Sequence, residues 1–361
     1  MQGSRPVGGL PGVQGVKLRL STGTEEHDQG PARLWGIVLA GGEGRRVRPL
    51  MRRLSGTDLP KQYCAVIGRR SMLQHTLDRV ATSIDRDRIL TVIIREHARW
   101  AREQLPGTPP DLLVVQPSNR ETGPGLLLPL LRIHARDPAA AVAVFPADHF
   151  ILEEAVFMAH AVQAIRFLEH QPGRVLILGI APDRAETAYG WIEPGVELAR
   201  HSGYDLLAVR RFREKPDARV AERYFMQGFL WNSLVLVGRV ETFLSCIRQV
   251  LPRLWASFEA VAPALGTFRE SEALEEVYRG LPSVNLSRGL LERIPDRLGT
   301  IPVKGVHWSD WGDEQRIRET LARIGKEEEL ALRLQEARES GGGRRQKEKS
   351  AAASESCPDA A

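Results

Sequence analysis

Cysteine is scarce in this chain of 361 residues, which contains only Cys64, Cys246 and Cys357. Their number is odd, they lie far apart, and none belongs to a Cys-x-x-Cys pair. This pattern excludes a disulfide framework and a zinc ribbon. It is typical of proteins that stay reduced, so the sequence predicts a cytoplasmic location.

Long hydrophobic runs are also missing. No window approaches the ~18 consecutive apolar residues of a membrane-spanning helix. The N-terminal segment is basic, but glycine and proline interrupt its apolar residues, so it lacks the continuous apolar stretch of a secretory signal. The sequence therefore predicts no membrane partner.

Neither sign of charge is in large excess, and aromatic residues make up only 6% of the chain. There are 50 Lys and Arg residues against 45 Asp and Glu residues, and the basic residues are interleaved with the acidic ones. Nucleic-acid-binding proteins usually show a basic stripe with stacking aromatic residues. We therefore expect no nucleic-acid partner, and the arginines suit a small polyanionic ligand.

Apolar residues make up 42% of the chain, which allows a sizeable core and excludes disorder of the whole chain. Short apolar runs predict strands over 34–40, 89–95, 111–116, 140–145 and 174–180, and later over 189–192, 208–212 and 230–237. Longer amphipathic runs predict helices over 71–81, 97–105, 125–135 and 155–169. This alternation predicts an α/β fold with a Rossmann-like, mostly parallel sheet flanked by helices.

The two ends of the chain differ in composition from its middle. Residues 1–33 are rich in glycine and predict a flexible leader, with one short strand over 16–20. Residues 34–313 carry the α/β pattern, and 314–338 predict a C-terminal helix whose spacing is clearest over 314–335. Residues 339–361 have low complexity and predict a disordered tail.

A loop rich in glycine and arginine follows the first predicted strand and contains Gly41, Gly42, Gly44, Arg45, Arg46 and Arg48. Backbone N–H groups in such a turn form an anion-binding concavity, and guanidinium groups suit phosphate oxygens. The dinucleotide-binding spacing Gly-x-Gly-x-x-Gly would need glycine at Val47, and the Gly-Lys-Ser/Thr of a Walker A loop is absent. The loop predicts a phosphate site, with a plain tight turn as the alternative.

Seven segments resemble, in order, motifs of the sugar-1-phosphate nucleotidyltransferases, most closely the mannose-1-phosphate guanylyltransferase branch. They are 39–50 with LPKQY (59–63), QPSNRETGP (116–124), PADH (146–149), TAYGWI (187–192), FREKPD (212–217), WNS (231–233) and WSDWG (308–312). The resemblance spans about residues 34–313 and implies the nucleotide-diphospho-sugar transferase type of α/β fold. One such motif would be weak support for the resemblance, but seven motifs in the order found in the family point to that family specifically.

The resemblance implies that an oxygen of a sugar-1-phosphate attacks the α-phosphorus of a nucleoside triphosphate and that pyrophosphate leaves. In the named branch, GTP and mannose-1-phosphate give GDP-mannose with Mg²⁺ as cofactor. The resemblance assigns catalysis to Arg46, Lys61 and Lys215. It assigns the nucleotide to Gly41, Gly42, Gly44, Arg45, Gln116, Asn119 and Arg120, the sugar to Gly190, Glu214 and Asn232, and the metal to Asp148 and Asp310.

Simpler structural roles stay open for three of these residues. Asp148 can cap the following helix, and Asp310 and Asn232 can form turns. His149 is expected to be structural, because magnesium prefers oxygen ligands.

Several positions depart from the family pattern. Arg45 stands where threonine is common, Ala188 and Leu234 stand where glycine is common, and Asn285 stands where an aspartate is usual. These changes leave two alternatives open: a different pair of sugar-1-phosphate and nucleotide, or a non-catalytic homologue that binds a nucleotide-sugar and regulates a partner. The sequence leaves the oligomeric state open, including a homo-oligomer.

Overall fold

The computed structural model describes residues 34–337 and 339. The predicted leader over 1–33, with its strand over 16–20, lies outside the described residues, as does the predicted tail from residue 340 onward.

Within the described residues, the core is a sheet of nine strands in the order β3-β2-β1-β4-β9-β6-β10-β8-β7. Their bounds are β1 Leu34–Leu39, β2 Ile89–Ile94, β3 Leu113–Gln116, β4 Ala141–Pro146, β6 Val175–Ile180, β7 Gly190–His201, β8 Tyr204–Glu214, β9 Leu230–Arg239 and β10 Leu298–Val303. A separate two-stranded sheet pairs β5 (Phe150–Ile151) with β11 (Trp308–Ser309). Strands β3, β2, β1 and β4 are mutually parallel, and β6 is parallel to β10. Because β9 and β8 run antiparallel to their neighbours, the sheet is mixed but mostly parallel, which confirms the predicted fold class.

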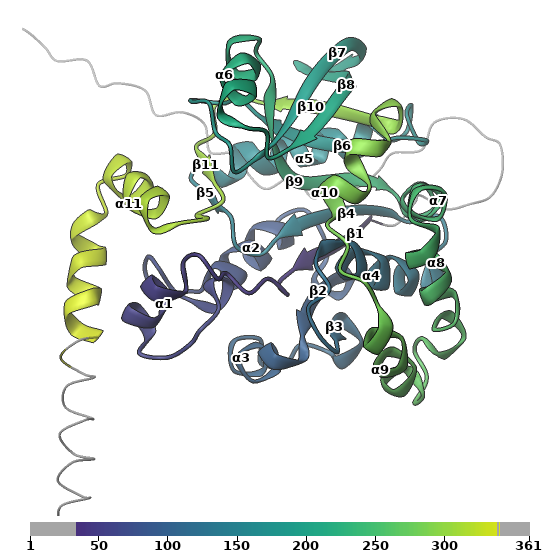
Figure 1. Ribbon diagram of the computed structural model, residues 1–361, viewed down its shortest axis with the longest axis horizontal. Helices are drawn as coiled ribbons and strands as arrows, with labels where there is room; N and C mark the ends of the chain where they lie inside the picture. The colour runs from purple at the N-terminus through teal and green to yellow at the C-terminus, as the bar shows by residue number, and fades with distance from the viewer. Residues whose placement is uncertain (1–33, 338, 340–361) are drawn as a thin grey trace, which may run out of the picture.

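Helices cover both faces of the sheet (Figure 1). One apolar core lies between the sheet and α4 (Thr122–Arg136), α7 (Val240–Val250), α8 (Pro252–Glu259) and α9 (Glu270–Gly280). The other lies between the sheet and α2 (Met72–Ala81), α3 (Ala98–Gln104) and α5 (Glu154–Phe167). The other labelled helices are α1 (Arg48–Ser55), α6 (Ala218–Met226), α10 (Leu286–Gly289) and α11 (Glu314–Arg323), and a further helical segment begins at residue 327. No helix in the described part of the chain has both the length and the apolar character needed to cross a membrane.

Local sequence signals explain the elements that were predicted well. Every residue of β2, β4 and β6 is buried, as expected for strands covered on both faces. Helix α2 begins at a capping box in which Ser71 accepts a hydrogen bond from the backbone N–H of Gln74, and the Gln74 side chain accepts one in return.

Strands β7 and β8 are much longer than the predicted 189–192 and 208–212. They continue as an antiparallel hairpin that turns at Ser202 and Gly203, both with positive φ. All of the extra β7 residues, 193–201, are half-buried or exposed, so they lack the apolar run that predicts a strand. Strand β10 was not predicted, because Gly299 and Pro302 interrupt it.

The C-terminal segment is two helices rather than the single helix predicted over 314–335. Helix α11 ends at Arg323, and helical structure resumes at residue 327. The break follows from Gly325, whose φ of 66° is left-handed. Leu330 of the second helix is buried in a small cluster with Trp311 and with residues of α1, and Figure 1 shows both helices beside α1.

Candidate active site

The glycine-rich loop follows β1 at the carboxyl end of the sheet and is held in place by Gln62. The Gln62 side-chain amide donates to the carbonyl oxygens of Ala40 at 2.7 Å and Gly42 at 2.8 Å. Gly44 has a φ of 57°, and a Cβ there would lie 3.1 Å from the Lys61 Cβ. The LPKQY segment therefore positions the loop as well as supplying Lys61. Gln62 was part of the recognised motif but was not assigned a role.

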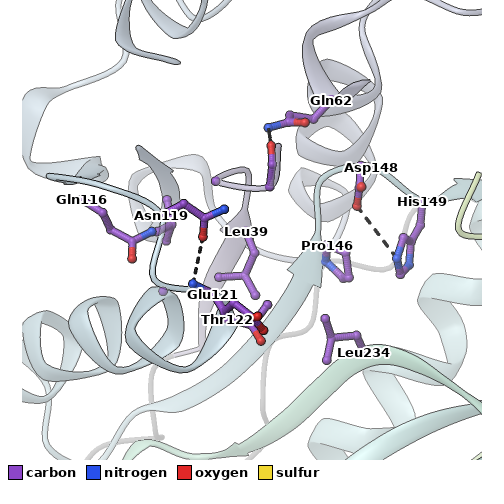
Figure 2. Close-up of a pocket in the computed structure, with 14 residues that line it drawn as sticks. Leu39, Gln62, Gln116, Asn119, Glu121, Thr122, Pro146, Asp148, His149 and Leu234 are labelled. Carbon is purple, nitrogen blue, oxygen red and sulfur yellow. Dashed lines mark hydrogen bonds and ion pairs between the residues drawn. The ribbon is translucent and has the colours of Figure 1, made fainter. Parts of the chain in front are cut away.

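A pocket of about 280 Å³ opens beside this loop, between the ends of β1, β3 and β4. Its lining includes Leu39, Gly41, Gly42, Gln62, Gln116, Asn119, Glu121, Thr122, Pro146, Asp148, His149 and Leu234. Figure 2 shows Asn119, Glu121 and Thr122 on one side and Asp148 and His149 on the other. The pocket therefore lies at the carboxyl ends of parallel strands, where open α/β sheets bind ligands.

Gln116 is the buried polar group at one end of this pocket, with 4% of its surface exposed. Its Oε1 accepts a hydrogen bond from the Tyr278 hydroxyl at 3.0 Å. Its Nε2 would lie 3.3 Å from a Cβ at Gly41, so Gly41 leaves room for this amide beside the loop. The remaining Gln116 donor is thereby held at the pocket wall.

Asn119 and Arg120 are adjacent in sequence but take different places. The Asn119 amide donates to Glu43 Oε1 at 3.2 Å, and its Oδ1 accepts from the Glu121 N–H at 2.8 Å, which joins this segment to the glycine-rich loop. The Arg120 side chain does not line the pocket, and its guanidinium donates to the Tyr278 carbonyl oxygen at 2.9 Å.

The loop arginines are mostly open to solvent. Arg45 is 78% exposed and pairs with Glu43 at 2.5 Å, and this hydrogen bond holds the pKa of the Glu43 carboxyl below its usual range. Arg46 is 57% exposed, and its guanidinium lies 4.0 Å from Asp310 Oδ2. Both arginines are therefore able to turn toward a polyanion.

Lys61 brings together Asp148, which lines the pocket, and Asp310, which lies behind the pocket lining. Lys61 is only 4% exposed, and its Nζ lies 2.9 Å from Asp148 Oδ2 and 2.5 Å from the Asp310 carbonyl oxygen. Burial is the strongest single effect on both carboxyls and opposes their charge, but the attraction of Lys61 and weaker attractions from neighbouring groups together outweigh it, so the pKa of each carboxyl lies below its usual range. Both carboxylates are therefore ionised at neutral pH.

The two aspartates differ in their other partners. Asp310 Oδ1 accepts hydrogen bonds from the Tyr189 hydroxyl and the Gly312 N–H, each at 2.9 Å, and the Gly312 bond realises the turn role left open for this residue. Asp148 is not a helix cap, because Glu153 occupies the N-cap position of α5. Apart from its ion pair with Lys61, the Asp148 carboxylate is therefore not committed to capping the helix and can accept a ligand.

The chemistry of these two carboxylates suits a magnesium ion. Within the part of the chain that the structure describes, no group of three or more His, Cys, Asp or Glu side chains is arranged to hold a metal. Magnesium binds readily through one or two carboxylates completed by substrate phosphates and water. Burial lowers the pKa of the adjacent His149 to about 4, so its imidazole is neutral at physiological pH.

Gly190, Glu214 and Asn232 meet on neighbouring strands β7, β8 and β9. A Cβ at Gly190 would lie 2.7 Å from Glu214 Oε2 and 3.2 Å from the Asn232 Cβ, so a side chain there would displace the Glu214 carboxylate. Asn232 Nδ2 lies 3.4 Å from the Ser287 hydroxyl oxygen, and burial raises the pKa of Glu214. Lys215 Nζ lies 3.4 Å from Glu214 Oε1. The predicted sugar-binding residues thus form one polar cluster with Lys215.

Non-glycine residues with positive φ, which mark backbone strain, concentrate in the motifs that resemble the family. Among the described residues, the non-glycine positions with positive φ are Glu121, Ser202, Lys215, Leu234 and Trp311, and all except Ser202 lie in or beside the recognised motifs. Such residues cost on the order of 1–3 kcal/mol each and cluster at functional sites. Leu234, with a φ of 56°, occupies a position where the family commonly has glycine, and it lines the pocket.

Two other departures have structural roles. Asn285 caps α10 by accepting a hydrogen bond from the Arg288 N–H at 3.1 Å, a role that asparagine and aspartate fill equally well. The Ala188 N–H donates to Glu186 Oε1 at 2.9 Å, and its φ is not positive.

Fold and site together define a nucleotidyl transferase. The family model described as Nucleotidyl transferase matches residues 35–326, and the chain belongs to this family. The xanthan biosynthesis protein XanB of Xanthomonas campestris pv. campestris is 30% identical over 282 residues, which cover 76% of this chain and 57% of that protein. Mannose-1-phosphate guanylyltransferase of Escherichia coli K12 is 29% identical over 300 residues, covering 81% of this chain and 60% of that enzyme.

The chain therefore spans less than two thirds of the length of these curated relatives. A crystal structure described as mannose-1-phosphate geranyltransferase from Thermus thermophilus is similar with a TM-score of 0.68 at 27% identity, covering 80% of this chain and 78% of that one. These matches confirm the family resemblance that the seven sequence segments indicated.

Proposed function

We propose that this chain transfers a guanylyl group from GTP to mannose-1-phosphate, giving GDP-mannose and pyrophosphate with magnesium as cofactor. The observation that carries the proposal is the convergence of Lys61, Asp148 and Asp310 beside the glycine-rich loop. Relatives named mannose-1-phosphate guanylyltransferase support this choice of substrates.

In this proposal, an anionic oxygen of mannose-1-phosphate attacks the α-phosphorus of GTP. The bond from that phosphorus to the bridging oxygen of the β-phosphate breaks, and pyrophosphate leaves with its electron pair. The nucleophile is already ionised, so no general base is needed. The protein's task is to position two polyanions that repel each other and to neutralise their charge.

The loop N–H groups and Arg46 bind the triphosphate, and Lys61 contacts the phosphates nearest the reacting phosphorus. Lys215 holds the sugar phosphate, while Glu214 and Asn232 hydrogen-bond the sugar hydroxyls. Asp148 and Asp310 hold magnesium, which supplies charge neutralisation at the phosphates when it is bound. Gln116 offers its remaining amide donor to the base or ribose.

A different sugar-1-phosphate is the second candidate, and the placement of Leu234 favours it. An isobutyl side chain lines the pocket at a position where the family commonly has only a hydrogen atom. This side chain fills space and adds apolar surface next to the ligand, which changes the shape that a sugar must match.

The test is pyrophosphate release from purified protein with magnesium, offered each nucleoside triphosphate with mannose-1-phosphate, glucose-1-phosphate and other sugar phosphates in turn. Release that requires GTP and mannose-1-phosphate supports the proposal. Release with another pair moves the specificity and keeps the reaction. No release from folded protein that still binds GDP-mannose would show a regulatory homologue instead.

A further inference from the structure

Arg316, in the first turn of α11, is a buried cation that the recognised motifs do not include. Its side chain is 8% exposed, and its guanidinium lies 3.1 Å from Asp310 Oδ1 and 3.0 Å from Glu186 Oε2. The guanidinium carbon also lies 4.8 Å from the centre of the Tyr189 ring. One side chain thus touches both the predicted metal ligand and the turn that leads to Gly190.

The contacts to Asp310 are unequal. Oδ1 is fully engaged by Tyr189, Gly312 and Arg316, whereas Oδ2 faces Arg46 at 4.0 Å. A Cβ at Gly312 would lie 2.4 Å from Asp310 Oδ2 and 2.8 Å from nitrogen atoms of both Arg316 and Arg46. The Asp310 carboxylate and the two guanidinium groups therefore converge on one point. The plane of the Asp310 carboxylate is fixed there, with Oδ2 directed toward a cation.

The contacts to Glu186 hold the turn that leads into Gly190. Glu186 Oε1 accepts from the Ala188 N–H at 2.9 Å, and its carbonyl oxygen accepts from the Trp191 indole N–H at 2.7 Å. The carboxylate that Arg316 binds therefore holds the turn that leads into Gly190. A planar guanidinium can bridge two carboxylates at once, which the point charge of lysine does less well.

We propose that Arg316 is a positioning residue that joins the metal ligand Asp310 to the sugar-binding turn. This inference rests on the proposed function, because it takes Asp310 as a magnesium ligand and Gly190 as a sugar contact. Arg316 also partly neutralises Asp310, which by itself weakens cation binding. Orientation outweighs this effect, since residues that hold a metal ligand contribute about 10–100-fold to metal affinity.

The test uses Mn²⁺ as a paramagnetic probe of the magnesium site, titrated by electron paramagnetic resonance without substrates. In Arg316→Gln, we expect the Mn²⁺ dissociation constant to rise about tenfold or more. The KM for mannose-1-phosphate rises as well, while the KM for GTP changes little. Arg316→Lys, which keeps the charge, shows the same two defects.

Arg318→Gln is the matched control, because Arg318 is 52% exposed on the same helix and pairs with Glu314. It should match the wild type in both measurements. Glu186→Gln breaks the bridge from its other end, so it should raise the KM for mannose-1-phosphate while leaving Mn²⁺ affinity unchanged. This variant also keeps the inference testable if Arg316→Gln does not fold.

Unchanged or tighter Mn²⁺ binding in folded Arg316→Gln would overturn the inference, since Arg316 would then be only a counter-charge. Full rescue by Arg316→Lys, or an unchanged sugar KM in Glu186→Gln, would overturn it too. The Mn²⁺ titration needs no turnover, so failure of the proposed reaction is seen separately as wild-type protein that binds Mn²⁺ but releases no pyrophosphate.

Discussion

Replacing Asp148 by asparagine separates a metal-binding role from a structural one. The substitution keeps the shape of the side chain but removes the negative charge that lies 2.9 Å from the buried Lys61 ammonium. Lys61 still has the carbonyl oxygens of Asp310 at 2.5 Å and Trp311 at 3.4 Å as acceptors. We therefore expect a loss in unfolding free energy of about 1–3 kcal/mol, less than for a fully orphaned buried charge.

This loss is too small to abolish activity by unfolding. A domain with an unfolding free energy of about 5 kcal/mol would still be more than about 95% folded after losing 3 kcal/mol. A residue that holds the cation over the reacting phosphates contributes far more to turnover, on the order of 100-fold or more. The two roles therefore predict clearly different activities at nearly the same folded fraction.

The assay is pyrophosphate release at saturating substrates across a magnesium titration, alongside thermal unfolding of the same samples. Asp58→Asn is the control, because Asp58 is 53% exposed and forms a surface pair with Arg52. We expect the control to behave as wild type in both measurements. Near-wild-type turnover in folded Asp148→Asn, with the same magnesium dependence, would refute the assignment of Asp148 as a ligand.

Two further predictions concern stability and the sugar site. Burial lowers the pKa of His97, so below its ordinary pKa the unfolded chain binds a proton that the folded chain does not. Stability to urea should therefore fall as the pH decreases from about 6.5 toward the lowered pKa, and less steeply in His97→Asn. An equal slope in both proteins would contradict this. Gly190→Ala places a methyl group 2.7 Å from Glu214 Oε2, so the KM for the sugar phosphate should rise with little change in the KM for GTP. A selective rise for GTP would place the sugar elsewhere.

The strands that carry the pocket could be predicted from the sequence because each buried strand is a continuous run of apolar residues. β1, β2 and β4 are short, apolar and bounded by turn residues, so local pattern was sufficient. The hairpin of β7 and β8 exposes much of its length, and long-range pairing rather than composition determines its extent. Local pattern consequently predicted only the parts near the sheet core.

The site itself depends on residues that lie far apart in the sequence and meet only in the fold, so their spacing along the chain does not predict it. Asp148 follows β4 and Asp310 follows β11, and both reach Lys61 only because the chain returns to the same edge of the sheet. Family resemblance supplied this grouping, and the residues alone did not. Neighbours such as Asn119 and Arg120 show the same limit, because the backbone sends one side chain toward the glycine-rich loop and the other toward Tyr278.

Arg316 illustrates why a functional cation can go unnoticed in sequence. Helix α11 also carries Arg318 and Arg323, and all three residues are compatible with a solvated helix face. Arg318 and Arg323 are 52% and 60% exposed, whereas Arg316 is 8% exposed. The Arg316 side chain is buried because its guanidinium pairs with the carboxylates of Asp310 and Glu186, beside which the Asp313 cap begins the helix. Burial of one arginine among three therefore depends on partners that the fold brings to it from outside the helix, which periodicity does not report.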